Sequence, residues 1–219
     1  MKKIKISIVC MMLLMFIVAA VSLMFLNDTI PTHFGIDGNP DQFGSKYLVL
    51  IFPGISLLIG VSMLLISKYA MVSDNYKKYM LLTGCILQVM FLVLIVIFIL
   101  YVLSYVDDFP TFDISKIMMI LFGLMFIVMG NFMPKIEKNS TLGLRTKWSM
   151  YNETTWQKSH RFTGFMGVIV GVLCLILSLF FNETVNFIIL MSLILIFIVS
   201  TTIASYIYYK NEKKLEFNN

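Results

Sequence analysis

The side chains that could do chemistry are few in this chain, and most of them lie in two polar segments. The first segment, residues 30–47, holds His33 between two prolines and ahead of Asp37-Gly38, a pair that favours a turn. Histidine binds metals, but a metal site needs several ligands, and this segment offers no cysteine and no second histidine. We expect no metal here. We interpret Pro31, His33, Asp37 and Gly38 as a recognition surface, or His33 as a source of hydrogen bonds that stabilise a compact loop.

The second polar segment, residues 130–162, carries six basic and two acidic side chains. The planar guanidinium of Arg145 suits phosphate, and with His160 it could hold a phosphate at a membrane surface. Asn152 is typical of a helix N-cap, with Glu153 in the first turn. Trp156 and His160, four residues apart, share one face of the helix that follows. The composition also fits an interfacial helix held by tryptophan and lysine.

Membrane helices must position both segments. The chain is 59% hydrophobic and 13% charged, whereas a soluble domain carries about 25% charged residues. Its apolar blocks are long enough to cross a hydrocarbon core of roughly 30 Å, and lipid leaves backbone groups no partner outside a helix. We predict an all-α polytopic membrane protein, a bundle of six spans at residues 6–26, 47–67, 79–105, 115–133, 162–181 and 185–209. The alternative for the first span is a signal sequence cleaved near Ala20-Val21-Ser22.

The basic residues predict how the spans are oriented. Placing both termini in the cytoplasm leaves only Lys46 and Lys116, of the 17 Lys and Arg residues, outside. The net charge of +5 is then a topology signal rather than a sign of direct nucleic-acid binding. On this basis the chain divides into residues 1–67 with an extracytoplasmic loop at 27–46, residues 68–133, a cytoplasmic connector at 134–161, and residues 162–219. We expect a multi-pass protein of the bacterial cytoplasmic membrane.

The interiors of the predicted spans lack ionisable groups. Ion-coupled transport and catalysis in a membrane need such groups, so we expect no catalytic residue and no cofactor within the bundle. Gln88 fits an interhelical hydrogen bond better than a ligand site. Gly164, Gly167 and Gly171 lie near one face of the fifth span, and Gly167-x-x-x-Gly171 matches the small-residue pattern of close helix packing.

The order of residues in the two polar segments resembles a known family. The stretch IPTHFGIDGNPDQFGSK resembles the extracytoplasmic motif of a bacterial membrane domain of formerly unknown function. The stretch GNFMPKIEKNSTLGLRTKWSMYNETTWQKSHR resembles the signature of the SdpI-type immunity protein family. The signature positions are Asn131, Pro134, Asn139, Gly143, Arg145, Thr146, Trp148, Trp156 and His160. Many family members have proline where Lys138 and Lys147 stand, which implies a looser connector backbone here.

The resemblance implies a non-enzymatic protein that protects its cell against a secreted killing peptide, which would be met by the outer loop. It further implies a signal-transducing receptor whose inner face, shaped by the signature residues, holds a small cytoplasmic repressor at the membrane. Two alternatives stay open. One is a regulatory membrane anchor without immunity; the other is an enzyme or transporter for lipid-linked envelope precursors, with Arg145 and His160 gripping a phosphate. Membrane lipids are partners in each case.

Overall fold

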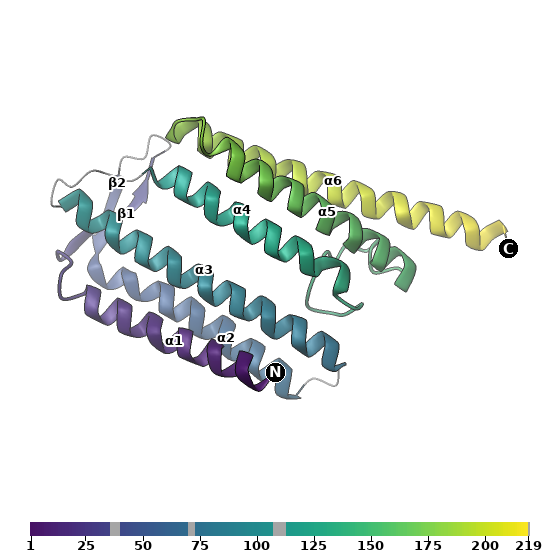
Figure 1. Ribbon diagram of the computed structural model, residues 1–219, viewed down its shortest axis with the longest axis horizontal. Helices are drawn as coiled ribbons and strands as arrows, with labels where there is room; N and C mark the ends of the chain where they lie inside the picture. The colour runs from purple at the N-terminus through teal and green to yellow at the C-terminus, as the bar shows by residue number, and fades with distance from the viewer. Residues whose placement is uncertain (36–39, 70–72, 107–112, 219) are drawn as a thin grey trace. The chain divides into compact units, whose positions relative to one another are not determined.

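The protein is described by a computed structural model that covers residues 1–35, 40–69, 73–106 and 113–218 (Figure 1). Six helices of the described residues are long and apolar enough to cross a membrane. They are α1 (Lys2–Ser22), α2 (Ile51–Tyr69), α3 (Asp74–Val106), α4 (Ile114–Phe132), α5 (Glu153–Leu177) and α6 (Glu183–Asn218). The predicted helical membrane class and its six spans are therefore confirmed. The chain forms two compact units, Met1–Ile114 and Ser115–Asn219.

Several helix ends differ from the predicted spans, and three of them affect the loops and the site. Helix α1 ends at Ser22 rather than near residue 26, and the apolar residues that follow form a turn in which Leu26 is buried in the core of the first unit. Helix α5 begins at Glu153, so the interfacial helix and the fifth span are one continuous element. Helix α6 continues past the predicted end at 209 as far as Asn218. The apolar content of a sequence indicates which residues can lie in lipid, but not where a helix ends. A helix continues beyond its apolar residues where contacts with the rest of the protein stabilise it.

In the first unit, α1, α2 and α3 pack around an apolar core that includes Met15, Val49 and Ile95. Gln88 is fully buried between α2 and α3. Its side-chain amide donates to the Ser56 carbonyl at 2.8 Å and accepts from the Ser56 hydroxyl. The predicted interhelical hydrogen bond is thus present, and it satisfies a polar group that lipid could not.

The first polar segment is predicted as a compact loop, and the structure makes it an antiparallel hairpin of β1 (Thr29–Phe34) and β2 (Pro40–Ser45), followed by the short helix η1 (Lys46–Leu50). The base of the hairpin is closed by Lys46, whose backbone N–H donates to the Asp28 carbonyl and whose ammonium lies 2.9 Å from the Asp28 carboxylate. Ile30 is fully buried in the apolar core, which fixes β1 on the helices and leaves β2 largely exposed.

In the second unit, α4 and α5 approach closely through two reciprocal glycine pairs. A Cβ on Gly164 would lie 2.6 Å from the Gly130 carbonyl oxygen, and one on Gly130 would lie 2.7 Å from the Gly164 oxygen. Gly171 and Gly123 repeat the arrangement at 2.5 and 2.9 Å. A Cβ on Gly167 would have more room, at 3.3 Å from the Phe126 oxygen. The contact therefore repeats every seven residues along both helices, with Gly164 and Gly171 at its centre.

Candidate functional site in the connector between helices 4 and 5

The connector starts where α4 runs into the short helix η2 (Met133–Lys135). Asn131 is exposed, and its amide donates to the Ile127 carbonyl one turn back at 2.8 Å. Pro134 follows, and its ring lies where a Cβ on Gly164 would meet it at 2.9 Å. These two signature residues therefore end α4 and place the connector against α5.

Asn139 organises the next turn through its side chain alone. Its Oδ1 accepts from the backbone N–H groups of Thr141 at 2.7 Å and Leu142 at 2.6 Å. Its Nδ2 donates to the Glu137 carbonyl at 2.8 Å and to the Leu142 carbonyl at 3.2 Å. An asparagine amide can bridge donors and acceptors of a turn in this way, so Asn139 fixes residues 137–142.

His160 is fully buried and holds the turn that follows. Its Nδ1 lies 2.9 Å from the Trp156 carbonyl, so this nitrogen carries the proton and donates. Its Nε2 therefore accepts, and the backbone N–H of Leu144 donates to it at 3.2 Å. Gly143 has φ +97°, a conformation that favours glycine, and a Cβ there would lie 2.1 Å from His160 Nε2. The neutral imidazole and the glycine therefore require each other.

Trp156 completes this buried centre. Its indole N–H donates to the Ile136 carbonyl at 2.8 Å, and its ring stacks on that of His160 with centroids 3.8 Å apart. The sequence places Trp156 and His160 on one helix face. The structure shows that this face is hydrogen-bonded to the connector backbone at two points, Ile136 and Leu144. The first turns of α5 thus hold the connector backbone in place at both points.

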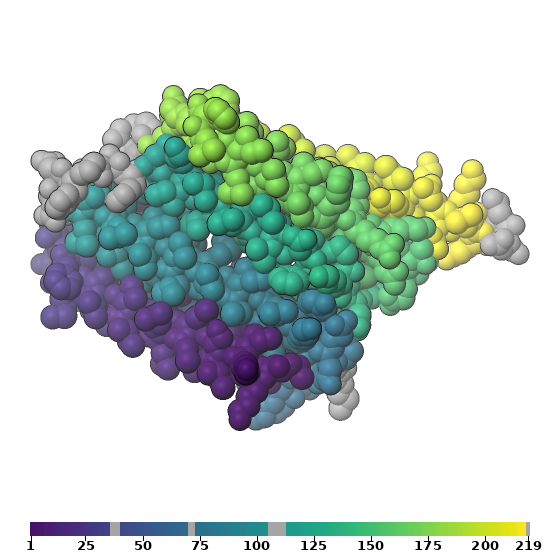
Figure 2. Space-filling view, viewed as in Figure 1, coloured from purple at the N-terminus to yellow at the C-terminus, as the bar shows by residue number. Residues whose placement is uncertain are grey.

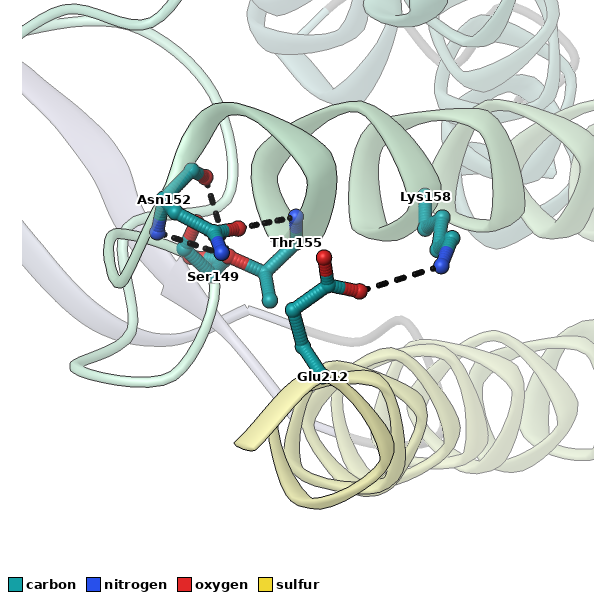
Figure 3. A network of polar contacts seen from close by, with 5 residues as sticks. All are labelled: Ser149, Asn152, Thr155, Lys158 and Glu212. Atoms are coloured by element: carbon teal, nitrogen blue, oxygen red, sulfur yellow. Dashed lines mark hydrogen bonds and ion pairs between the residues drawn. The ribbon is translucent and has the colours of Figure 1, made fainter. Parts of the chain in front are cut away.

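The predicted N-cap at Asn152 is confirmed and belongs to a capping box (Figure 3). The Asn152 Oδ1 accepts from the Thr155 N–H at 2.8 Å, and the Thr155 hydroxyl oxygen accepts from the Asn152 N–H at 3.0 Å. Ser149, also buried, donates from its hydroxyl to the Leu144 carbonyl at 2.6 Å. Sequence reasoning missed Thr155 and Ser149, although the Asn-x-x-Thr spacing of the cap was visible.

The second half of the connector packs along α6. Thr146 shares a hydrogen bond of 3.0 Å with Ser205, and the Trp148 ring packs edge-on against Tyr206 with centroids 5.0 Å apart. Tyr151 donates from its hydroxyl to Glu216 at 2.5 Å, a bond that raises the pKa of the Tyr151 phenol and keeps it protonated.

One turn into α5, the ammonium of Lys158 lies 3.2 Å from the Glu212 carboxylate (Figure 3). This ion pair joins the start of α5 to α6, close in sequence to the contact between Tyr151 and Glu216. The C-terminal turns of α6 are therefore part of the site, which the sequence did not indicate.

The signature residues thus divide into two groups. Asn139, Gly143, Trp156 and His160 hold the backbone, whereas Arg145 is exposed. Further exposed cations of this segment are Lys135, Lys147, Lys158 and Arg161. The arrangement presents positive charge on a connector whose backbone is held by buried contacts.

The hairpin holds the remaining predicted site residues. His33 Nδ1 lies 2.6 Å from the Asp41 carboxylate across the two strands, with the side chains 59% and 51% exposed. Pro31 is buried, while Asp37 and Gly38 lie outside the described residues. Among the residues that the structure covers, no group of three His, Cys, Asp or Glu side chains could hold a metal ion. His33 therefore has a hydrogen bond within the hairpin and an exposed ring edge.

Six membrane-length helices, a polar hairpin and a hydrogen-bonded connector define a multi-pass membrane protein. Residues 135–205 match the model of the SdpI/YfhL protein family, and residues 10–57 match DUF1648, a domain of unknown function. The resemblance to the SdpI-type immunity protein family is thus confirmed, and the chain is a multi-pass bacterial membrane protein. The first match contains most of the connector, and the second contains the hairpin.

Among individual proteins, the chain is 39% identical over 88 residues to Immunity protein SdpI of Bacillus subtilis, which covers 40% of this chain and 42% of that protein. It is 44% identical over 43 residues to an uncharacterized protein of Archaeoglobus fulgidus, covering 20% of this chain and 24% of that protein. The matches thus span less than half of either relative. No solved structure is significantly similar.

Proposed function

We propose that this chain is a non-enzymatic membrane immunity protein that protects its cell against a secreted antimicrobial peptide. The observation that carries the proposal is the 39% identity to Immunity protein SdpI. The structure supports it because His160, the signature side chain of an acid–base type, is buried and its two ring nitrogens are occupied by backbone hydrogen bonds. A buried, neutral imidazole with both nitrogens engaged is not available as an acid or base.

The hairpin is the surface that we assign to the peptide. If all six helices span, successive connections alternate between the two membrane faces, so the hairpin after α1 and the connector after α4 lie on opposite sides. The excess of lysine and arginine in the other connections supports an extracytoplasmic position for the hairpin. His33 and Asp41 are its exposed hydrogen-bonded pair, and β2 is its exposed strand.

The proposal predicts that expressing this chain in a peptide-sensitive bacterium raises the killing concentration of the cognate peptide. Replacing both His33 and Asp41 with alanine should lower that protection about tenfold, which corresponds to a loss of about 1.4 kcal/mol of peptide binding. Gln157→Ala, which removes an exposed polar side chain of α5 outside the hairpin, is the control and should protect normally. Membrane level and insertion are measured for each variant by immunoblot and accessibility labelling. Unchanged killing of cells that hold the inserted wild-type chain would contradict the proposal.

We further propose that the connector holds a small cytoplasmic repressor at the membrane, so that peptide binding outside relieves repression. Support comes from the exposed Arg145 and Lys147 on a connector whose backbone is fixed by buried contacts. A rigid cationic surface suits an acidic patch on a partner. The peptide would shift the chain between two states that bind the repressor differently.

The repressor proposal predicts that Arg145→Gln with Lys147→Gln releases the repressor while protection is retained. The measurement is membrane association of a fluorescently tagged candidate repressor protein, with and without peptide. Lys68→Gln with Lys78→Gln removes two exposed cations elsewhere and is the control; like Lys147, both lie over an adjacent aromatic ring. Equal membrane association in both double variants would exclude the connector as the binding surface.

A further inference from the structure

The C-terminal part of α6 is longer than a membrane span requires. The helix has 36 residues, whereas about 20 cross the hydrocarbon. Its end forms the projecting part of the second unit (Figure 2, yellow). Here Tyr206, Tyr208 and Tyr209 are followed directly by Lys210, Lys213 and Lys214. Tyrosine is typical of the membrane interface, and we expect lysines that follow such tyrosines on a helix at the level of the lipid headgroups.

At this end of α6 the acidic and the basic side chains lie on different faces of the helix. Glu212 pairs with Lys158, and Glu216 accepts from the Tyr151 hydroxyl, so both acidic side chains are turned toward α5 and the connector. The three lysines are exposed. The ammonium of Lys213 lies 5.9 Å from the Tyr209 ring centroid and 6.0 Å from that of Phe217. The helix therefore presents a cationic, aromatic face that its own acidic residues do not neutralise.

This face is hollowed in two adjoining places. The first hollow is lined by Trp148, Thr202, Ile203 and Tyr206 and is apolar. The second begins at the same Tyr206 and continues along Tyr209, Lys210, Lys213 and Lys214 to Phe217. Along α6 the surface thus changes from apolar to aromatic to cationic, moving from the span toward the helix end. An anionic phospholipid has the same order, from acyl chain to glycerol to phosphate.

We propose that this groove binds an anionic phospholipid, with an acyl chain against Trp148 and Ile203 and the phosphate at Lys210, Lys213 and Lys214. A lipid fits better than an acidic polypeptide because Ile203 lies about 20 residues from the start of α6 at Glu183, the length that crosses the hydrocarbon, so acyl chains are available at the apolar hollow. Each lysine near an anionic headgroup contributes a favourable electrostatic interaction that falls off within a Debye length. The inference depends on neither the immunity proposal nor the orientation of the chain.

The two tryptophans provide the test, because Trp148 lines the groove and Trp156 is fully buried. The full chain is placed in phosphatidylcholine vesicles, and acyl-brominated phosphatidylglycerol is added to quench Trp148. We expect stronger quenching than with brominated phosphatidylcholine, and about fivefold weaker apparent binding for each lysine replaced by glutamine. Raising the salt concentration should weaken binding in the same direction. The Trp148→Phe variant gives the background from Trp156.

Lys68→Gln with Lys78→Gln, two exposed cations of the first unit, is the charge-matched control for any two of the groove lysines. Equal quenching by the two brominated lipids would overturn the proposal, as would an equal loss of binding in the control. A polyglutamate peptide that protects Trp148 with the same lysine dependence, while phosphatidylglycerol does not quench, would assign the groove to an acidic polypeptide and also overturn it. Thermal unfolding of each variant establishes that it is folded.

Discussion

Replacing Gly143 with alanine should destabilise the connector by about 3 kcal/mol, the combined cost of a strained backbone and a lost buried hydrogen bond. The φ of +97° disfavours any residue with a Cβ. The new Cβ would also lie 2.1 Å from His160 Nε2, so the ring must leave its place between Trp156 and the Leu144 N–H. Both effects act on the same turn, which is why a single methyl group is expected to open it.

Hydrogen exchange at the Leu144 amide measures this effect directly, since that N–H donates to His160. A loss of about 3 kcal/mol corresponds to an exchange rate about a hundredfold faster. Gly54→Ala is the matched control, because no atom lies within 4 Å of its added Cβ and alanine favours the helix there. Exchange in Gly143→Ala at the wild-type rate would show that the connector does not depend on this turn.

Two further variants separate backbone strain from the clash. Gly143→Asn tolerates the left-handed backbone but still carries the Cβ, so it should remain destabilising. In a His160→Ala background, Gly143→Ala should lower the stability only by the cost of the strained backbone, because the imidazole ring that its Cβ would clash with is absent. The difference between the two backgrounds gives the coupling energy of Gly143 and His160. A coupling near zero would mean that the contact contributes nothing.

Features that depend on neighbouring residues were predictable from the sequence. The Asn152 cap, the shared face of Trp156 and His160, the six spans and the Gln88 hydrogen bond are all indicated by spacing or by the cost of burying a polar group in lipid. Each follows from a rule that links a few positions, so one sequence suffices to state it. The helical membrane class follows from composition alone.

Features that depend on distant segments were not predictable. Gly143 is one of the signature positions, but the reason that it must be glycine is the His160 ring, seventeen positions along the chain. Likewise the bonds from Trp156 to Ile136 and from Thr146 to Ser205 join residues whose proximity is set by helix packing. The hairpin depends on Ile30 reaching the core of the helices, which alternation in so short a strand could not reveal.

The glycines of α5 show the same limit. Gly167-x-x-x-Gly171 matches a familiar packing pattern, yet the tight contacts fall on Gly164 and Gly171. Their partners Gly130 and Gly123, in α4, were missed. The signal was the seven-residue spacing in both helices, 123 to 130 and 164 to 171, which brings two glycine pairs together when the helices run antiparallel.

Replacing Gly164 with alanine should therefore destabilise the second unit by about 2 kcal/mol, within the usual cost of overpacking. The methyl group would meet the Gly130 carbonyl oxygen at 2.6 Å and the Pro134 ring at 2.9 Å, and backbone cannot move aside as a flexible side chain can. Gly167→Ala should cost much less, because its nearest contact is 3.3 Å and alanine raises helix propensity. Thermal unfolding in detergent, followed by Trp156 fluorescence, measures both.

Comparing the destabilisation by Gly164→Ala with that by Gly167→Ala shows whether the Gly130–Gly164 pair or the Gly167-x-x-x-Gly171 motif forms the packing contact. If Gly167-x-x-x-Gly171 were the packing surface, Gly167→Ala would be at least as damaging as Gly164→Ala. If the reciprocal pair governs the approach of the helices, Gly130→Ala should match Gly164→Ala. The double variant should then cost less than the sum, since the first methyl group already separates the helices and leaves room for the second. Additive costs would instead mean that each glycine fits an independent space, and the close approach of α4 and α5 would not depend on the pair.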